Sequence, residues 1–355
     1  MRKNKKVKPL VVSTICAALM SVPLVVNPIA SAVVYEAIFS SRYQPEDYST
    51  LAYSDFSGLC VDRSDFLTDN GAKLAGYKYY KENVGVRGLV VLAHGLGCGG
   101  HNMFIPFIDY FTSNGYYVFT YDATGNGESE GSSIEGLPQG VIDLDYALNH
   151  VSKIREYKGL PVVLFGHSWG AYSCGNVLNF HPEIKAAIII SGCNESGDFI
   201  LSKSKEKVGN IAKLFTPAVS TYEKIKFGTK YTSISAIDGM KNSNAKIMIV
   251  HSRDDSQVPA EYGYDKFYSE FKNNDRFEFV LYENRGHNYL FFSEESAKYR
   301  DMINKEYKEY VESSGKEYSA EIKSEFMSAH LDKKRAFEPD YDLMAKILKM
   351  YDSVC

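Results

Sequence analysis

This sequence lacks features that would mark several common classes of protein. It has no excess of positive charge: 40 Lys and Arg residues stand against 44 Asp and Glu, for a formal net charge of −4. Without a basic field the chain does not attract polyanions, so nucleic acid is not expected as a partner. It also has no internal repeat and no low-complexity tract. With 45% hydrophobic and 24% charged residues, its composition is that of an ordinary globular protein.

Cysteine is scarce and irregularly spaced. The six residues are Cys16, Cys60, Cys98, Cys174, Cys193 and Cys355. No Cys-x-x-Cys pair occurs, so the spacing predicts neither a zinc site nor a disulfide framework. Five of the six lie beyond the amino-terminal apolar segment, so at least one is unpaired in a monomer. We interpret them as small, buried apolar residues and expect no metal site.

Residues 1–39 have the composition of an export signal. The chain begins with a basic cluster formed by Arg2, Lys3, Lys5, Lys6 and Lys8. A mostly apolar stretch from Leu10 to Phe39 follows, and this order predicts a signal peptide or a signal-anchor transmembrane segment. Ala30-Ser31-Ala32 favours cleavage, whereas the apolar character that resumes at Val33 favours retention as a membrane anchor, which we prefer. Either way, the rest of the chain is expected outside the cytoplasm, membrane-anchored or secreted.

Short apolar runs alternate with helix-like stretches after a linker and entry segment at 40–71. The clearest runs are Gly88 to Ala93, Tyr117 to Tyr121, Pro161 to Phe165, Ala186 to Ile190, Lys246 to Val250 and Phe277 to Tyr282. Continuous apolar runs of this length are typical of strands that are covered on both faces. The alternation therefore predicts an α/β fold with a mostly parallel sheet flanked by helices. Its ligand site is expected beyond the carboxyl ends of the strands.

Two segments do not follow this alternation, so the predicted core comprises residues 72–192 and 245–291. Residues 193–244 are a long, helix-leaning insertion between two strands, and they are expected to form a cap over the site. Residues 292–355 are charged and predict a carboxy-terminal extension of two or three amphipathic helices. These helices could pack across the sheet, cover the pocket or meet a membrane; we expect packing.

The strongest catalytic signal is Gly166-His167-Ser168-Trp169-Gly170, a G-x-S-x-G sequence. It lies directly after one predicted strand and before a predicted helix. In a tight turn between strand and helix, side chains at the two glycine positions would collide with neighbouring backbone. Glycine removes the collision and exposes the serine hydroxyl, so we expect Ser168 to be a nucleophile.

A serine hydroxyl needs a base to accept its proton. His287 follows the last predicted strand and is the expected base, whereas His150, His181 and His251 are interpreted as structural. The acid is either Asp254 or Asp255. The Asp-x-x-Val-Pro spacing favours Asp255, with Asp254 as a turn residue. The acid would hold the histidine tautomer and stabilise the imidazolium.

An oxyanion intermediate needs two converging backbone N–H groups. We expect one from Trp169, directly after the nucleophile, and one from Leu96 in the glycine-rich loop that follows the first buried strand. His94 is expected to brace this loop. Cys98 and His101 are candidate substrate contacts.

Several of these motifs together resemble the α/β-hydrolases, most closely their serine aminopeptidase and monoacylglycerol-lipase-like branch. The resemblance rests on His94-Gly95-Leu96-Gly97, on Tyr121 to Ser129, on Gly166 to Gly170, on Asp255 and on Gly286-His287. It implies hydrolysis through an acyl-enzyme, with neither a metal nor an organic cofactor. The chain departs from the family at Thr124 and Asn126, where arginine and histidine are common, and at Trp169, where methionine is frequent.

The function predicted from the sequence is that of a serine hydrolase. Its expected substrate is a small-molecule carboxylic ester, with a peptide, an amide or a thioester as further options. Two alternatives stay open: a membrane-tethered acyltransferase that uses the same triad, and a hydrolase-like binding protein without turnover. The sequence predicts no oligomeric state.

Overall fold

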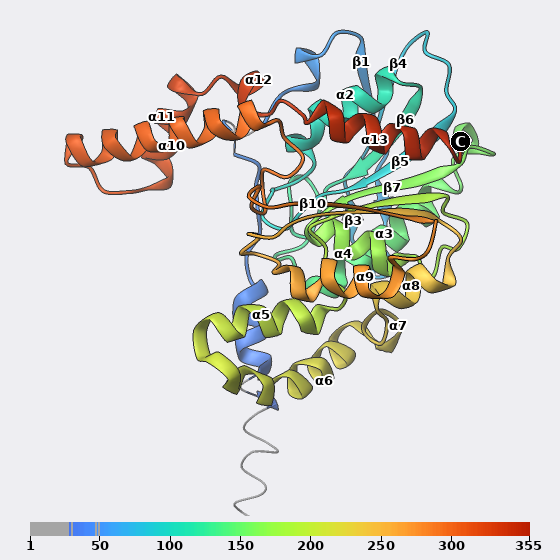
Figure 1. Ribbon diagram of the computed structural model, residues 1–355, viewed down its shortest axis with the longest axis horizontal. Helices are drawn as coiled ribbons and strands as arrows, with labels where there is room; N and C mark the ends of the chain where they lie inside the picture. The colour runs from blue at the N-terminus through green and yellow to red at the C-terminus, as the bar shows by residue number, and fades with distance from the viewer. Residues whose placement is uncertain (1–27, 30, 47, 49) are drawn as a thin grey trace, which may run out of the picture.

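A computed structural model describes residues 28–355 of the chain apart from residues 30, 47 and 49 (Figure 1). Its centre is an eight-stranded sheet in the order β1-β4-β6-β5-β7-β8-β9-β10. The strands are β1 (Leu59–Arg63), β4 (Gly76–Lys81), β6 (Tyr116–Tyr121), β5 (Gly88–Ala93), β7 (Val162–His167), β8 (Ala186–Ile190), β9 (Lys246–Ser252) and β10 (Phe277–Tyr282). From β6 to β10 every neighbouring pair is parallel, whereas β1–β4 and β4–β6 are antiparallel. The predicted mostly parallel α/β fold is confirmed.

The edge of the sheet extends into the region that the sequence analysis treated as a linker. β1 lies within residues 40–71, where no strand was expected, and it pairs in register with β4 from Leu59↔Lys81 to Arg63↔Tyr77. A second, two-stranded sheet pairs β2 (Phe66–Leu67) with β3 (Lys73–Leu74). β1 was missed because only Leu59 in it is buried, so its sequence carries little of the apolar pattern that identifies a strand.

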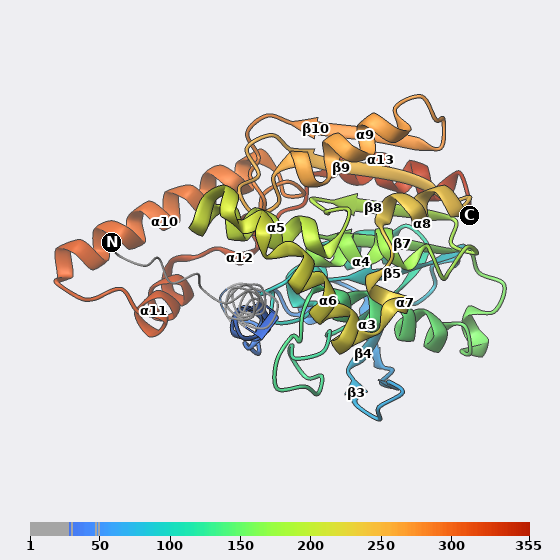
Figure 2. The ribbon, with the colours of Figure 1, turned by 90° about the horizontal axis from the view of Figure 1, so that it is seen from below.

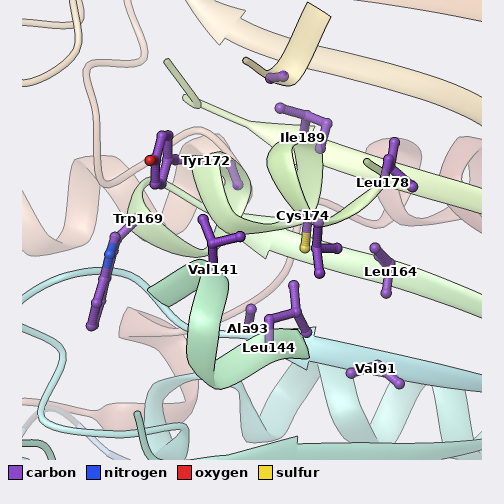
Figure 3. Close-up of a cluster of buried hydrophobic side chains, with 14 of the residues drawn as sticks. Val91, Ala93, Val141, Leu144, Leu164, Trp169, Tyr172, Cys174, Leu178 and Ile189 are labelled. Carbon is purple, nitrogen blue, oxygen red and sulfur yellow. The ribbon is translucent and has the colours of Figure 1, made fainter. Parts of the chain in front are cut away.

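Helices cover both faces of the sheet because alternate side chains of each strand point to opposite sides. In β5, Leu89 and Val91 belong to one apolar cluster, and Val90 and Leu92 to another. The first face packs against α3 (Leu137–Val151), α4 (Trp169–Val177) and α9 (Tyr264–Phe271). Figure 3 shows Val91 among the residues of this face that meet α3 and α4. The second face packs against α2 (Ile105–Ser113) and α13 (Tyr341–Asp352).

The insertion between β8 and β9 is helical, as the sequence indicated. It contains α5 (Ser196–Val208), η5 (Gly209–Leu214), α6 (Thr216–Phe227), α7 (Thr229–Thr232) and α8 (Ala236–Asn242). In Figures 1 and 2, α5 and α6 lie beyond the edge of the sheet layer, whereas α8 returns to it. The remaining short 3₁₀ turns are η2 (Tyr53–Asp55), η3 (Asn102–Phe104), η4 (Arg155–Tyr157) and η6 (Ala260–Tyr262).

The carboxy-terminal extension contains α10 (Glu294–Ser314), α11 (Ala320–His330), α12 (Lys333–Ala336) and α13. α13 packs across the sheet, and the buried hydroxyl of Tyr351 donates to the carbonyl of Leu164 in β7 at 2.8 Å. α10 and α11 instead form an arm that projects from the body of the molecule (Figure 1). The carboxy-terminal extension was expected to pack across the sheet, and α13 is the part of it that does so.

Most of the predicted signal or anchor, residues 1–27, lies outside the described residues. Residues 31–39 form a helix that lies beside α5 and α6 (Figures 1 and 2). On this helix Tyr35 and Phe39 are buried, whereas Val33, Val34 and Ile38 are exposed. Between residues 28 and 355, as far as they are described, no helix has the length and apolar character needed to cross a membrane.

The five described cysteines are all free thiols. Cys174 and Cys193 are buried, which agrees with their interpretation as small apolar residues. Cys355 is exposed, and Cys60 and Cys98 are partly exposed, so that interpretation is wrong for Cys355. Cys355 lies three residues beyond the end of α13.

Candidate active site

Ser168 occupies the sharp turn between β7 and α4. Its backbone has φ 56° and ψ −115°, a strained conformation for a residue with a side chain. The flanking glycines allow the turn, as their spacing predicted. A Cβ on Gly166 would lie 2.4 Å from the carbonyl oxygen of Gly170, and one on Gly170 would lie 2.0 Å from that of Ala93. Neither position can hold a larger residue unless the backbone moves.

Ser168, His287 and Asp255 form a continuous hydrogen-bonded chain. The hydroxyl oxygen of Ser168 is 2.9 Å from Nε2 of His287. On the other side of the imidazole ring, Nδ1 is 2.8 Å from Oδ2 and 3.0 Å from Oδ1 of Asp255. The three residues follow β7, β9 and β10 in the chain, and the parallel strands bring them to one edge of the sheet. The arrangement has the geometry of a nucleophile, a base and a residue that orients the base.

Asp255 is held as a carboxylate beside this histidine. Burial acts to raise its pKa, but the hydrogen bond and charge of His287, together with the backbone N–H of Val258, lower the pKa below its ordinary value. Its Oδ1 also accepts hydrogen bonds from the backbone N–H groups of Gln257 and Val258, both at 2.9 Å. A fixed anion here keeps the proton of His287 on Nδ1, which leaves Nε2 free to accept a proton from Ser168.

Asp254 has a different role. Its Oδ1 accepts from the hydroxyl of Ser252 at 2.5 Å and from the backbone N–H of Gly286 at 2.8 Å. It therefore connects the loop after β9 to the loop that carries His287, without contacting the imidazole ring. This is the turn residue that the sequence interpretation described.

The carboxy-terminal extension also braces the loop that carries the histidine. Arg285 donates to the carbonyl of Phe292 at 2.9 Å and to Oδ2 of Asp340 at 3.1 Å. Arg300 on α10 lies 4.3 Å from the ring centre of Tyr289 and 4.2 Å from that of Phe292. Side chains of the carboxy-terminal extension thus fix the loop from Arg285 to Phe292. Sequence reasoning did not connect these side chains with the site.

His167, the residue before the nucleophile, is a further contributor that the sequence analysis missed. Its Nε2 is 3.0 Å from the backbone carbonyl oxygen of His287. The two imidazole rings are 4.9 Å apart, and the ring of Phe291 is 4.7 Å from His167. Burial and the neighbouring charge of His287 lower the pKa of His167 to about 3. A neutral His167 therefore supports the backbone of the loop that carries His287. Its position inside the G-x-S-x-G motif was the one sequence feature that could have indicated this role.

The glycine-rich loop after β5 lies next to the nucleophile. Leu96 lines the cavity in front of Ser168, and Trp169 is the first residue of α4, where a helix leaves its backbone N–H groups without intrahelical partners. His94 is buried and joins two loops: Ala123 N–H donates to its Nε2, and its Nδ1 is 2.9 Å from the carbonyl oxygen of Gly95. It thus has the bracing position that was expected for it.

A cavity of about 200 Å³ opens at Ser168 and His287. Its walls are mainly apolar, and among them are Leu137, Tyr172 and Phe199. Figure 3 shows Trp169 and Tyr172 together at one end of the α3–α4 cluster. The side chain of Trp169 is turned toward α3, where its Nε1 donates to the carbonyl of Leu137 at 2.9 Å. Such a cavity suits an apolar group attached to the carbonyl that Ser168 would attack.

The two expected substrate contacts differ in position. Cys98 lines the cavity, and burial raises the pKa of its thiol to about 12, so it is a neutral wall residue. His101 is not among the residues that line the cavity, so the structure does not support the expected substrate contact. Its Nδ1 is 2.8 Å from Oδ1 of Asp122, and its Nε2 is 2.8 Å from the hydroxyl of Tyr79. Both ring nitrogens are therefore engaged in holding the end of the glycine-rich loop.

A larger depression of about 540 Å³ lies elsewhere, beside Asp145 and Lys230. The carboxylate of Asp145 is already paired with His181 at 2.8 Å and with Lys230 at 2.7 Å. No serine or cysteine lines this depression, and we do not assign chemistry to it. Within the described part of the chain, no group of three or more His, Cys, Asp and Glu side chains is placed to hold a metal ion.

The fold is shared with solved α/β structures. An esterase from Pyrococcus furiosus superposes with a TM-score of 0.53 at 17% identity, and the match covers 81% of this chain and 98% of that one. An acetyl xylan esterase from Paenibacillus sp. R4 gives a TM-score of 0.51 at 14% identity, over 67% of this chain and 82% of that one. At these identities the likeness concerns the fold.

Sequence comparison finds relatives for part of the chain. The serine aminopeptidase S33 family matches residues 85–243. A monoglyceride lipase of Saccharomyces cerevisiae is 29% identical over 43% of this chain and 49% of its own length. A caffeoylshikimate esterase of Arabidopsis thaliana is 34% identical over 33% of this chain and 36% of its own length. The chain thus spans half or less of these curated relatives. Over this part its sequence is similar to the serine aminopeptidase S33 family and to a monoglyceride lipase, and its fold is that of the α/β-hydrolases.

Proposed function

We propose that this protein is a serine hydrolase that cleaves a small carboxylic ester through an acyl-enzyme. The observation that carries the proposal is the unbroken chain from the hydroxyl of Ser168 through His287 to Asp255, at 2.9 Å and 2.8 Å. A serine at a strained turn, with a base on its oxygen and a carboxylate behind the base, is arranged for nucleophilic attack. The names of the matched relatives, a lipase and an esterase, support an ester as the substrate.

The first half of the reaction forms the acyl-enzyme. Ser168 Oγ attacks the ester carbonyl while its proton moves to Nε2 of His287, and Asp255 stabilises the resulting imidazolium. The carbonyl oxygen becomes an oxyanion, for which we assign the backbone N–H groups of Leu96 and Trp169 as donors. When this intermediate collapses, the bond to the leaving alkoxide breaks and His287 Nε2–H donates its proton to the departing oxygen. An alcohol leaves and Ser168 is acylated.

The second half of the reaction returns the enzyme to its starting state. Water attacks the acyl carbonyl and gives one proton to Nε2 of His287. The same two N–H groups hold the second oxyanion. Its collapse breaks the bond to Ser168 Oγ, which recovers its proton from His287, and the carboxylic acid leaves. Every step uses only protein side chains, backbone donors and water.

The helical insertion is proposed to cover the site and to set its specificity. Phe199 on α5 and Cys193 at the start of the insertion line the cavity together with residues of the core. A substrate in the cavity would therefore contact both parts of the chain. This fits the general pattern in which the core of a fold supplies the machinery and the loops choose the substrate.

The decisive experiment is labelling of the protein with a fluorophosphonate probe, followed by peptide mass mapping and an assay with p-nitrophenyl butyrate. We expect an adduct on Ser168, and we expect turnover to fall about a thousandfold or more in Ser168→Ala. Ser173→Ala is the matched control, because Ser173 lies one helical turn further along α4 and its hydroxyl donates to the carbonyl of Trp169. Folded protein with neither adduct nor turnover would refute the proposal and favour a binding protein.

We also propose that residues 1–39 export the chain and anchor it to a membrane, with the hydrolase outside the cytoplasm. Support comes from the basic and apolar order of residues 1–27 and from the apolar side chains of Val33, Val34 and Ile38, which are exposed on the helix that follows. Cell fractionation of the full chain and of a chain starting at residue 28 tests this. The full chain is expected in the membrane fraction; recovery of both chains in the soluble fraction would contradict anchoring.

A further inference from the structure

The cavity at Ser168 is small for a site that encloses a ligand. Its volume of about 200 Å³ falls below the roughly 300–1,000 Å³ of sites that enclose drug-sized ligands. Leu137 and Tyr172 form part of its apolar wall. What lies behind these two residues decides whether a longer group could extend the cavity.

Tyr35, on the helix formed by residues 31–39, lies directly behind this wall. Its side chain is 2% exposed. A Cβ on Gly136 would lie 2.1 Å from the hydroxyl oxygen of Tyr35, so the phenol packs against the backbone immediately before Leu137. Gly136 has φ +148°, and glycine is therefore required both by the backbone and by the contact.

The hydroxyl of Tyr35 belongs to a buried polar cluster with Glu223 and Ser196. Tyr35 donates to Oε1 of Glu223 at 2.8 Å, and the hydroxyl of Ser196 donates to the same oxygen at 2.5 Å. Glu223 on α6 is only 4% exposed, and burial raises the pKa of its carboxyl group. Burial, followed by the charge of Glu223, also raises the pKa of Tyr172, which lines the cavity.

The helix of residues 31–39 is tied to its surroundings on a second side. Lys226 on α6 pairs with Glu36 at 2.7 Å and with Glu135 at 3.0 Å. The rings of Tyr35 and Tyr222 are 5.4 Å apart in an edge-to-face arrangement. The helix, α6 and the turn before α3 therefore form one packed unit behind Leu137.

We propose that Tyr35, held by Glu223 and Ser196, packs behind the wall of the acyl pocket at Leu137 and keeps that wall in place, so that the enzyme is restricted to short acyl chains; this inference rests on the proposed ester hydrolysis. A longer acyl chain would have to push Leu137 back, and with it the phenol of Tyr35, away from Glu223. That displacement leaves the buried carboxyl group of Glu223 without one of its two hydroxyl donors, which is unfavourable for a polar group out of contact with water.

The test is a chain-length series of p-nitrophenyl esters from acetate to palmitate. For the unmodified chain, kcat/KM is expected to be highest for butyrate or hexanoate and to fall on the order of tenfold or more by laurate. Equal or faster turnover of laurate and palmitate would overturn the inference while leaving the proposed function intact. No turnover of any ester, together with no adduct on Ser168, would instead refute the proposed function.

Substitutions of Tyr35 test whether this side chain limits the length of the pocket. Tyr35→Ala is expected to lower the hexanoate-to-laurate ratio of kcat/KM about tenfold, whereas Tyr35→Phe, which keeps the ring, should change it less than about threefold. Lys224→Ala, at an exposed position of α6 next to Glu223, is the matched control and should leave the ratio unchanged. If Tyr35→Ala does not fold, Tyr35→Leu retains an apolar side chain and supplies the same comparison. A folded Tyr35→Ala or Tyr35→Leu enzyme with the original ratio would refute the assignment.

Discussion

Replacing Asp255 by asparagine tests the chemistry of the site with little change in shape. Asp255 presents Oδ1 to the backbone N–H groups of Gln257 and Val258, and Oδ2 to Nδ1 of His287 at 2.8 Å. Asparagine keeps one oxygen for the backbone donors and places its NH₂ group toward the imidazole ring. Nδ1 must then accept a hydrogen bond, so the proton of neutral His287 moves to Nε2. In that tautomer Nε2 cannot take the proton of Ser168.

The size of the effect follows from the loss of the base. When the same substitution leaves a triad with the wrong tautomer, kcat falls about 10⁴-fold, which corresponds to about 5 kcal/mol of transition-state stabilisation at 1.36 kcal/mol per factor of ten. For Asp255→Asn we therefore expect a decrease in kcat of about 10³- to 10⁴-fold toward p-nitrophenyl butyrate, with a smaller change in KM. The rate of fluorophosphonate labelling should fall in parallel.

Asp254→Asn is the matched control, because the two residues are adjacent in the same loop. Oδ1 of Asp254 accepts from the hydroxyl of Ser252 and from Gly286 N–H, and asparagine retains an acceptor for both. We expect kcat to fall less than about tenfold. If Asp254→Asn lost more activity than Asp255→Asn, with both proteins folded, the assignment of the acid would be wrong.

Two further substitutions test the architecture around the site. Gly170→Ala places a Cβ 2.0 Å from the carbonyl oxygen of Ala93. We expect denaturant titration to show a loss of about 1–3 kcal/mol in the free energy of unfolding, and the ester assay to show a fall in turnover. A stable, fully active variant would contradict the steric role of this glycine. Asp122 is the second: burial opposes ionisation, but the hydrogen bond and charge of His101 lower its pKa to about 2. Because the folded-state pKa is depressed, its contribution of about 2–3 kcal/mol is present above about pH 5 and is lost as the pH falls toward 2. Asp122→Asn should therefore be less stable than the unmodified chain at pH 7, and the difference should shrink at pH 3; a constant difference in thermal unfolding at both pH values would refute this linkage.

The carboxy-terminal extension contributes to the site because it holds the loop that carries His287. α13 covers the second face of the sheet, and Asp340 at its start holds Arg285. α10 contributes Arg300, which lies over the rings of Tyr289 and Phe292. Both contacts fall within five residues of His287. A segment that looked separate from the core in the sequence is therefore part of what positions the base.

The sequence by itself determined the central sheet and the order of the reactive groups. Strands such as β5, β7 and β8 are buried on both faces, and a continuous apolar run is the direct consequence of that environment. The glycines around Ser168 were equally informative, because the turn admits no Cβ at either position. Local sequence reports such constraints well, since each depends on the residue itself and on a few neighbours.

Only the tertiary structure decided the contacts between distant segments. Tyr35 meets Glu223 across 188 positions of the chain, and both ring nitrogens of His101 are hydrogen-bonded, one to Asp122 and one to Tyr79. His167 supports the carbonyl of His287 from a position 120 residues earlier. No periodicity encodes such pairs, because a hydrogen bond between remote residues depends on how strands and helices are placed in space. The residues that perform the proposed chemistry could therefore be read from local motifs, whereas those that hold and limit the site required the fold.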